Sequence, residues 1–218
     1  GFLGRAQYNY GEKYFVSGSF RRDASTRFHK DHRWGNFGSV GAAWLMSAED
    51  WMSGADWVNM LKLKASYGVQ GNDNLGSYFP YSDQYSHSYN ETTKEYSLTL
   101  EYKGNEELTW ESSHSFNVGA DFSMFDNRFY GSVEYYSNRT TDMLTWFPMA
   151  PSSGYTGYYA NVGNVRNNGV EIDLHGEIIR SKDLKWDIYA NLTSNHNEIT
   201  SLPKERRTSW MDGHMGYS

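Results

Sequence analysis

The sequence contains no cysteine and only 4 prolines among its 218 residues. Without cysteine, the chain cannot form a disulfide scaffold or any zinc or redox motif that needs a thiolate. Long apolar runs are also missing, since no stretch approaches the roughly 18 residues that a membrane helix requires. A membrane β-barrel is still allowed, because each barrel strand turns only every second residue toward lipid.

Basic clusters are scarce as well. The net charge is −6, and the only short basic run is KERR at residues 204–207, which argues against a nucleic-acid partner. The first residues contain neither a basic segment nor an apolar segment of the kind found in export signals. We therefore expect any such signal to lie outside this sequence.

Aromatic residues and glycine are abundant instead. Aromatics make up 17% of the chain, with 18 Tyr and 8 Trp, and 21 Gly punctuate apolar residues that occur singly. This composition favours many short strands over helices or disorder.

Period-2 alternation predicts eight strands, and it is clearest in NNGVEIDLHGEIIR at residues 167–180. One side of that segment is apolar, with Val170, Ile172, Leu174 and Ile178, and the other is ionisable, with Glu171, Asp173, His175 and Glu177. The other seven segments are residues 4–10, 13–22, 34–46, 60–70, 113–125, 128–137 and 184–195. In order, the eight form four antiparallel hairpins.

The predicted connections alternate between short and long. The short ones are Gly11 and Glu12, residues 47–57, which are long enough for a helical turn, Asp126 and Asn127, and residues 181–183. The long ones are residues 23–33, 71–111, 139–163, and residue 195 onward. Outer-membrane barrels have short periplasmic turns and long extracellular loops, so this order favours a barrel over a soluble sandwich. Residues 96–102 also alternate, but a membrane strand there would reverse the order, so we place them in a long loop.

Aromatic side chains gather beside the short turns. Tyr8, Tyr10 and Tyr14 flank the first, and Trp44, Trp51 and Trp57 flank the second. Amphipathic rings at strand ends are typical of a membrane interface. This supports the barrel interpretation.

Five segments, in order, carry a family resemblance: RWGNFGSVGAAW, LKLKASYGVQGNDNLGSY, LTWESSHSFNVGADFSMFDNRFYGSVEYYSNRTTDML, NVGNVRNNGVEIDL and NLTSNHNEITSLP. Together they resemble the C-terminal half of the barrel in the SusC/RagA family of TonB-dependent outer-membrane transporters of Bacteroidetes. The resemblance covers nearly the whole chain.

The resemblance implies an all-β fold, in which this chain supplies about eight strands of a 22-stranded antiparallel transmembrane β-barrel with long extracellular loops. It implies a plug domain inside the barrel, a SusD-like surface lipoprotein as a lid, and energy from a TonB complex. Such transporters import oligosaccharides or, in the RagA branch, peptides. We expect residues 1–218 to be an internal barrel fragment in the bacterial outer membrane, without plug or final strands.

The ionisable row on residues 171–177 has two interpretations. Carboxylates at i and i+2 lie roughly 6–7 Å apart on one strand face and could share a ligand. No open-site ligand pattern accompanies them, so a hydrated lumen wall is favoured. We expect Glu171, Asp173, His175 and Glu177 to line the lumen and to face basic neighbours such as Lys62 or Lys64.

Two loop motifs contain residues that can ligate a metal ion. HKDH at residues 29–32 offers two imidazoles, and GNDNLG at residues 71–76 is rich in oxygen but departs from the spacing of a calcium loop. Solvated histidines and an Asn/Asp/Gly turn are the favoured interpretations. We expect no cofactor, with calcium as the alternative at the second motif. No catalytic arrangement is predicted, and we do not expect an enzyme.

Loop aromatics are the best candidates for binding. Flat ring faces suit sugar C–H surfaces or peptide side chains, and they are also enriched at protein interfaces. Contact with substrate and contact with the lipoprotein lid therefore both stay open for Tyr78, Tyr81, Tyr85, Tyr89, Trp146, Tyr155, Tyr158 and Tyr159.

The expected function is TonB-dependent import of nutrients, with glycans ahead of peptides. Two alternatives differ in class: a self-contained eight-stranded membrane barrel acting as an adhesin, and a soluble carbohydrate-binding β-sandwich.

Overall fold

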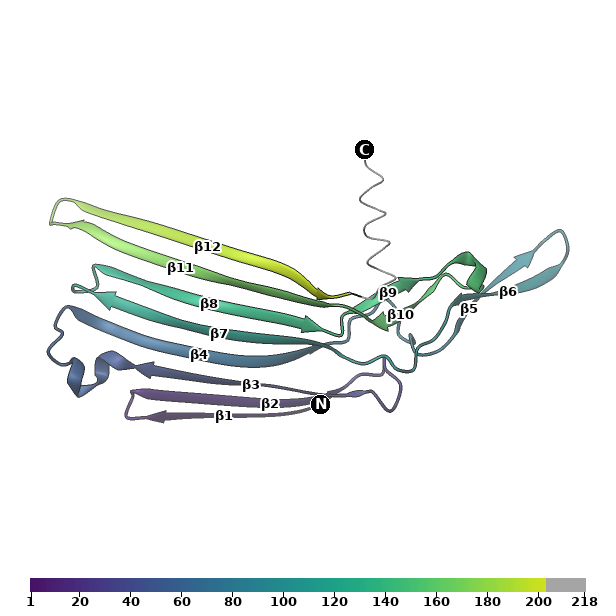
Figure 1. The fold of residues 1–218 in the computed structure, drawn as a ribbon, viewed down its shortest axis with the longest axis horizontal. Helices are drawn as coiled ribbons and strands as arrows, with labels where there is room; N and C mark the ends of the chain where they lie inside the picture. The colour runs from purple at the N-terminus through teal and green to yellow at the C-terminus, as the bar shows by residue number, and fades with distance from the viewer. Residues whose placement is uncertain (203–218) are drawn as a thin grey trace.

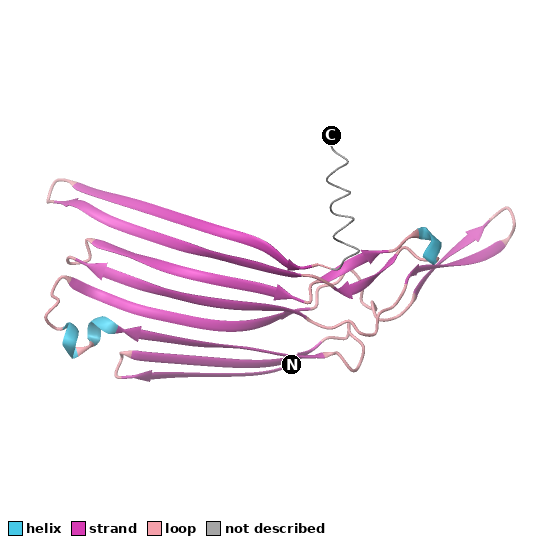
Figure 2. Cartoon of the chain, in the orientation of Figure 1, coloured by secondary structure: helices cyan, strands magenta, loops and turns pink. Residues whose placement is uncertain are grey.

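The computed structural model describes residues 1–202. This part of the chain is almost entirely strand and connecting loop, with three single-turn 3-10 helices (Figure 2). No helix among the described residues is long and apolar enough to cross a membrane.

Eight long strands form one antiparallel sheet in the order β1-β2-β3-β4-β7-β8-β11-β12 (Figure 1). Their bounds are β1 Phe2–Tyr10, β2 Tyr14–Ala24, β3 Trp34–Leu45, β4 Val58–Asn72, β7 Glu111–Met124, β8 Phe129–Thr141, β11 Asn164–Arg180 and β12 Lys185–Ser201. The eight predicted strands are confirmed, with ends at the predicted residue or one to four residues from it, apart from the C-terminal end of β12.

The sheet is a single layer with two open edges. β1 pairs only with β2, and β12 pairs only with β11, within residues 1–202. No second sheet packs against it face to face in this part of the chain, so the sandwich alternative is wrong. The open edges also contradict a self-contained eight-stranded barrel, which must close on itself.

The pairing register of the strands makes one face of the sheet apolar and the other polar. Val16, Ala42, Ala65, Val118 and Val170 belong to one cross-strand row, which is apolar. Because side chains alternate along a strand, the residues next to them occupy the other face. That face carries serine, asparagine and charged side chains, so it is polar.

The short connections all lie at one end of the sheet (Figure 1). At the first, Gly11 and Glu12 adopt positive φ of 57° and 56°, as a tight hairpin turn requires. Residues 46–57 contain the predicted helical turn as two 3-10 helices, η1 Met46–Ala48 and η2 Asp50–Met52. The predicted turns at residues 126–127 and 181–183 are also confirmed.

The long connections all lie at the opposite end and contain two small hairpins. β5 Gln84–Asn90 pairs with β6 Glu95–Tyr102, and this hairpin projects away from the main sheet (Figure 1). Placing residues 96–102 in a loop is therefore confirmed. The second hairpin, β9 Leu144–Pro148 with β10 Gly157–Asn161, was not predicted; η3 Pro151–Ser153 lies between its strands.

One boundary was wrong. We expected a loop from residue 195 onward, but β12 continues to Ser201. Asn195 pairs with Gly169 and Asn197 pairs with Asn167 on the polar face, so the polar composition of this segment reflects its surroundings and not a loop.

The only cluster of buried apolar side chains within residues 1–202 lies among the long loops and not on the sheet. Phe28 comes from the β2–β3 connection, and Leu75 and Leu108 come from the two ends of the β4–β7 connection; they are 0%, 7% and 0% exposed. Trp110, Leu144 and Tyr159 pack against them. This small core holds the loops together at one end of the sheet.

Candidate functional site

An aromatic hollow lies beside the loop core. Three rings meet edge to face: Trp146 and Tyr159 from the β9–β10 hairpin, with centroids 5.1 Å apart, and Tyr102 from the end of β6. Register explains the arrangement, because Trp146 and Tyr159 are cross-strand partners and so lie on one face of their hairpin.

The hollow has a volume of about 580 Å³ and combines ring faces with hydrogen-bonding groups. Tyr78 and Phe79 border it and are 72% and 55% exposed, whereas Tyr102 is only 9% exposed. Gln84 and Glu101 also line it. A few polar groups among flat apolar surfaces suit a ligand with both hydroxyl groups and C–H faces.

Tyr102 has a defined polar partner in the hollow, and Tyr159 has a raised pKa. The hydroxyls of Ser77 and Tyr102 are hydrogen-bonded to each other, which fixes the orientation of the Tyr102 ring. Burial raises the pKa of the Tyr159 phenol, and nearby Tyr102 and Glu101 add to this. Tyr159 therefore stays neutral at physiological pH and keeps its hydroxyl proton.

The predicted aromatics are divided among several places. Tyr78, Trp146 and Tyr159 line the hollow described above. Tyr155 and Tyr158 line a separate hollow of about 520 Å³ beside Lys103 and Asn105. The remaining three lie elsewhere, so the eight residues do not form one site.

Of the remaining three, Tyr81 contacts other loop rings, with centroids 6.2 Å from His29 and 6.4 Å from Phe79. Tyr85 and Tyr89 stand on the projecting β5–β6 hairpin and are 59% and 46% exposed. Sequence reasoning missed Tyr102, although its place at the end of an alternating segment was a usable signal.

The polar face of the sheet contains the predicted charged residues. Register places Lys64, Glu134 and Glu171 in one cross-strand row and Asp173 in the next. His175 and Glu177 follow on the same side of β11, toward the short turns. All six predicted lumen-lining residues therefore share the polar face: Lys62, Lys64, Glu171, Asp173, His175 and Glu177.

The expected pairing of Lys62 or Lys64 with these acids was wrong, because β7 and β8 lie between β4 and β11. Lys64 Nζ instead lies 3.0 Å from both Asp121 Oδ1 and Glu134 Oε2. The ammonium of Lys62 sits over the ring of Phe15, 5.4 Å from its centroid.

Asp173 and His175 on β11 contact residues of the adjacent strand β12. Asp173 accepts a hydrogen bond from Asn191. His175 stacks on Tyr189 with centroids 4.1 Å apart, and its Nε2 lies 3.4 Å from Asp187 Oδ1. These contacts are local hydrogen bonds, ring contacts and ion pairs along the polar face of the sheet.

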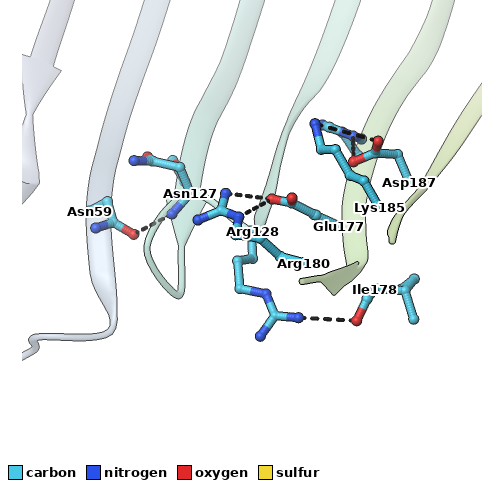
Figure 3. A network of polar contacts seen from close by, with 10 residues as sticks. Asn59, Asn127, Arg128, Glu177, Ile178, Arg180, Lys185 and Asp187 are labelled. Atoms are coloured by element: carbon cyan, nitrogen blue, oxygen red, sulfur yellow. Dashed lines mark hydrogen bonds and ion pairs between the residues drawn. The ribbon is translucent and has the colours of Figure 1, made fainter. Parts of the chain in front are cut away.

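A β-bulge changes the alternation at the end of β11. Glu177 pairs with Asp187 but the next pair is Ile179 with Trp186, so Ile178 is the extra residue and not part of the predicted apolar series. As a result, Glu177 and Arg180 meet on the polar face, where the guanidinium donates to the carboxylate (Figure 3).

Figure 3 also shows how neighbouring turns are tied together. Arg128 in the β7–β8 turn donates to the carbonyl of Ile178 at 3.0 Å, and the backbone N–H of Asn127 donates to Asn59 Oδ1 at 3.0 Å. Such bonds stabilise the relative positions of four strands at the short-turn end.

The two loop motifs with potential metal ligands make ordinary protein contacts. Asp73 in GNDNLG accepts a 2.6 Å hydrogen bond from the Ser25 hydroxyl, and its carbonyl accepts one from Arg27 at 2.9 Å. His29 contacts Asp31 at 3.2 Å. Residues 1–202 contain no group of three or more His, Cys, Asp or Glu side chains placed to hold a metal ion.

The fold and its faces define a class: a section of the wall of a large antiparallel barrel, with short turns at one rim and long loops at the other. The family model described as TonB dependent receptor-like, beta-barrel matches residues 1–212, and the chain belongs to this family. The predicted fold class is thereby confirmed.

Comparison with individual relatives supports the same family. The chain is 34% identical over 204 residues to TonB-dependent receptor P39 of Formosa agariphila and 31% identical over 209 residues to TonB-dependent receptor SusC of Bacteroides thetaiotaomicron. Each alignment covers 92% of this chain but only 19% and 21% of the relative. The chain thus spans about a fifth of the length of these relatives.

Solved structures give the same result. The RagAB peptide importer in its 'closed-closed' state matches with a TM-score of 0.83 and 33% identity over 92% of this chain and 22% of that chain. The siderophore receptor PirA from Pseudomonas aeruginosa matches with a TM-score of 0.58 at 15% identity, which indicates a shared fold alone.

Proposed function

We propose that the chain forms part of the wall and the outer mouth of a TonB-dependent importer of oligosaccharides in the bacterial outer membrane. One observation carries the proposal: a single-layer sheet with one apolar and one polar face leads to an aromatic hollow at its long-loop end. A lipid-facing wall needs the first feature, and capture of a ligand at the cell surface needs the second.

The polar face would line the transport path. Its charged groups are largely paired with one another, as Lys64 is with Asp121 and Glu134. A wall that is polar but internally compensated can stay hydrated without binding a passing solute tightly. No bond-making step is needed, so the proposed activity is transport and not catalysis.

Two partners belong to the proposal. A SusD-like surface lipoprotein would cover the mouth, with Tyr85 and Tyr89 on the projecting hairpin within its reach. A TonB complex would supply the energy for transport. Both follow from the relationship to SusC and RagAB.

Peptide import is the second candidate, and the RagAB match favours it. The aromatic hollow favours glycans, because three fixed rings with Gln84 and Glu101 nearby suit the C–H faces and hydroxyls of a sugar.

Binding to the complete transporter, measured by calorimetry with oligosaccharide and peptide libraries in parallel, tests the proposal. Tyr78→Ala should weaken oligosaccharide binding by about tenfold, since one exposed stacking ring contributes on the order of 1–2 kcal/mol. Tyr96→Ala is the matched control, because Tyr96 is equally exposed but lies on the projecting hairpin outside the hollow. Peptide binding that responds to Tyr78→Ala, with no oligosaccharide binding, would decide for the second candidate.

A further inference from the structure

Two arginines lie directly opposite each other on the apolar face of the sheet. Arg139 on β8 is the cross-strand partner of Arg166 on β11, and His114 on β7 is the partner of Arg139 on the other side. Arg166 is four residues from Val170 and His114 is four residues from Val118, so all three side chains share the face of those valines. This row faces away from the lumen.

The row lies just beyond the apolar band. Along β11, about a dozen ladder steps separate Ile179, near the short turns, from Arg166, which is roughly 40 Å of strand. A tilt of about 40° reduces this to about 30 Å along the membrane normal, and the apolar band of such barrels is about 25 Å tall. The arginines are therefore at the level of lipid headgroups, on the long-loop side.

The types of neighbouring residues support a position of this row at the level of the lipid headgroups. Tyr67 and Phe116 form the next row toward the membrane centre and are 44% and 41% exposed, as expected of interfacial rings. On the same face but closer to the loops, the Arg22 guanidinium sits 5.0 Å from the centroid of the Trp34 ring.

Neither Arg139 nor Arg166 has a side-chain partner among residues 1–202, and both are exposed. Glu198 on β12 is opposite Arg166 in the ladder but is not within ion-pair distance. By contrast, Arg21 and Arg180 on the polar face each have a carboxylate partner. Like charges directly opposite each other destabilise a strand pair, unless an anion lies between them.

We infer that Arg139 and Arg166 bind the phosphate of a phosphorylated glycolipid in the outer leaflet of the membrane. Two guanidinium groups on adjacent strands can each donate two parallel N–H bonds to phosphate oxygens. His114 borders the same place; its Nδ1 is 2.9 Å from the Tyr67 hydroxyl, which leaves Nε2 for the headgroup. The inference rests on the proposed location in the outer membrane.

The test uses the complete transporter, delipidated in detergent, and three probes: phosphorylated lipid A, the same lipid A after phosphatase treatment, and inorganic phosphate. Phosphorylated lipid A should bind the wild type and raise its melting temperature. Arg139→Gln combined with Arg166→Gln should weaken this binding by about tenfold or more. Arg5→Gln is the matched control, because Arg5 is an exposed arginine on the polar face of the same sheet.

Equal binding of dephosphorylated lipid A, or unchanged binding by the double variant, would overturn the inference. An equal effect of inorganic phosphate would also overturn it, because the anion would then not be a lipid headgroup. None of these results would contradict the proposed function, because each is compatible with an outer-membrane importer. A protein that folds and stays monomeric without detergent would instead contradict the proposed function itself.

Discussion

Lys64 and Glu134 form an ion pair across an intervening strand. Their Nζ and Oε2 atoms are 3.0 Å apart although β7 separates β4 from β8. Gly119 is the ladder partner of both residues, and its missing side chain leaves the path open. A Cβ built at Gly119 would lie 2.6 Å from the carbonyl oxygen of Val133.

Gly119→Ala should therefore destabilise the sheet by about 1–3 kcal/mol, because the added methyl group forces the adjacent backbone to move. Denaturant titration of the protein in detergent measures this. Gly4→Ala is the control, since a Cβ at Gly4 has no neighbour within 4 Å. Equal stability of the two variants would show that the close approach at Gly119 is not required.

Lys64→Met should have a smaller effect, roughly 0.5–1 kcal/mol, because the Lys64 side chain is 37% exposed and water screens its charge. A double-mutant cycle with Glu134→Gln isolates the coupling between the two groups. Coupling that survives unchanged in 1 M salt would contradict a hydrated lumen wall.

Val118→Arg should destabilise the protein in a bilayer by about 2–4 kcal/mol, since it places a charge within the apolar band. Asn117→Arg changes the adjacent residue on the polar face and should cost far less. Thermal unfolding in lipid vesicles compares the two variants. A larger cost for Asn117→Arg would reverse the assignment of the two faces.

Glu49 gives the short-turn end a pH dependence. Tyr14 donates a 2.7 Å hydrogen bond to its carboxylate, and Trp44 Nε1 and Lys13 Nζ donate at 3.0 and 3.3 Å. The Tyr14 hydrogen bond is the main cause that lowers the pKa of Glu49. A lowered pKa in the folded state means that the contribution to stability is present above the unfolded value of about 4.3 and is lost as the pH falls through the folded value.

Glu49→Gln should therefore lower the melting temperature at pH 7, and the difference from the wild type should shrink below about pH 4. Asp50→Asn is the control, because Asp50 is fully exposed and lies 3.9 Å from Lys13. The prediction fails if the difference between wild type and Glu49→Gln grows as the pH falls.

Phe28→Ala should loosen the loops and leave the sheet intact. Removing a fully buried phenylalanine costs about 3–5 kcal/mol, and here the loss falls on the small core that joins three long connections. Hydrogen exchange should rise in residues 73–83 and 103–110 but not in β4 or β7. Phe20→Ala, at a position that is 55% exposed on the sheet, should leave the loops unchanged.

The sheet could be predicted because the sequence signals that specify it lie within each strand and its adjoining turns. Alternation such as Val170, Glu171 and Ile172 reports which side of a strand is apolar, and the order of short and long connections gives the direction of each strand. The residues of β11 and β4 predicted to line the lumen accordingly share one face.

Contacts between distant segments were not predictable in the same way. The edge-to-face contact of Tyr102 with Trp146 requires a hairpin that residues 144–161 form without clear alternation. The pairing of Lys64 depends on the two strands inserted between β4 and β11. The bulge at Ile178 inserts one extra residue into β11 and shifts its register. A periodic sequence pattern does not show such an insertion.

Labelling of single cysteines on intact cells tests the central claim most directly, because this chain contributes no cysteine of its own. Thr92→Cys lies in the turn of the projecting β5–β6 hairpin, and Asp126→Cys lies in the short β7–β8 turn. A membrane-impermeant maleimide should label the Thr92 variant on intact cells and the Asp126 variant only after the outer membrane is broken. Labelling of the Asp126 variant alone on intact cells would contradict the orientation, and equal labelling of both would contradict a membrane-spanning wall.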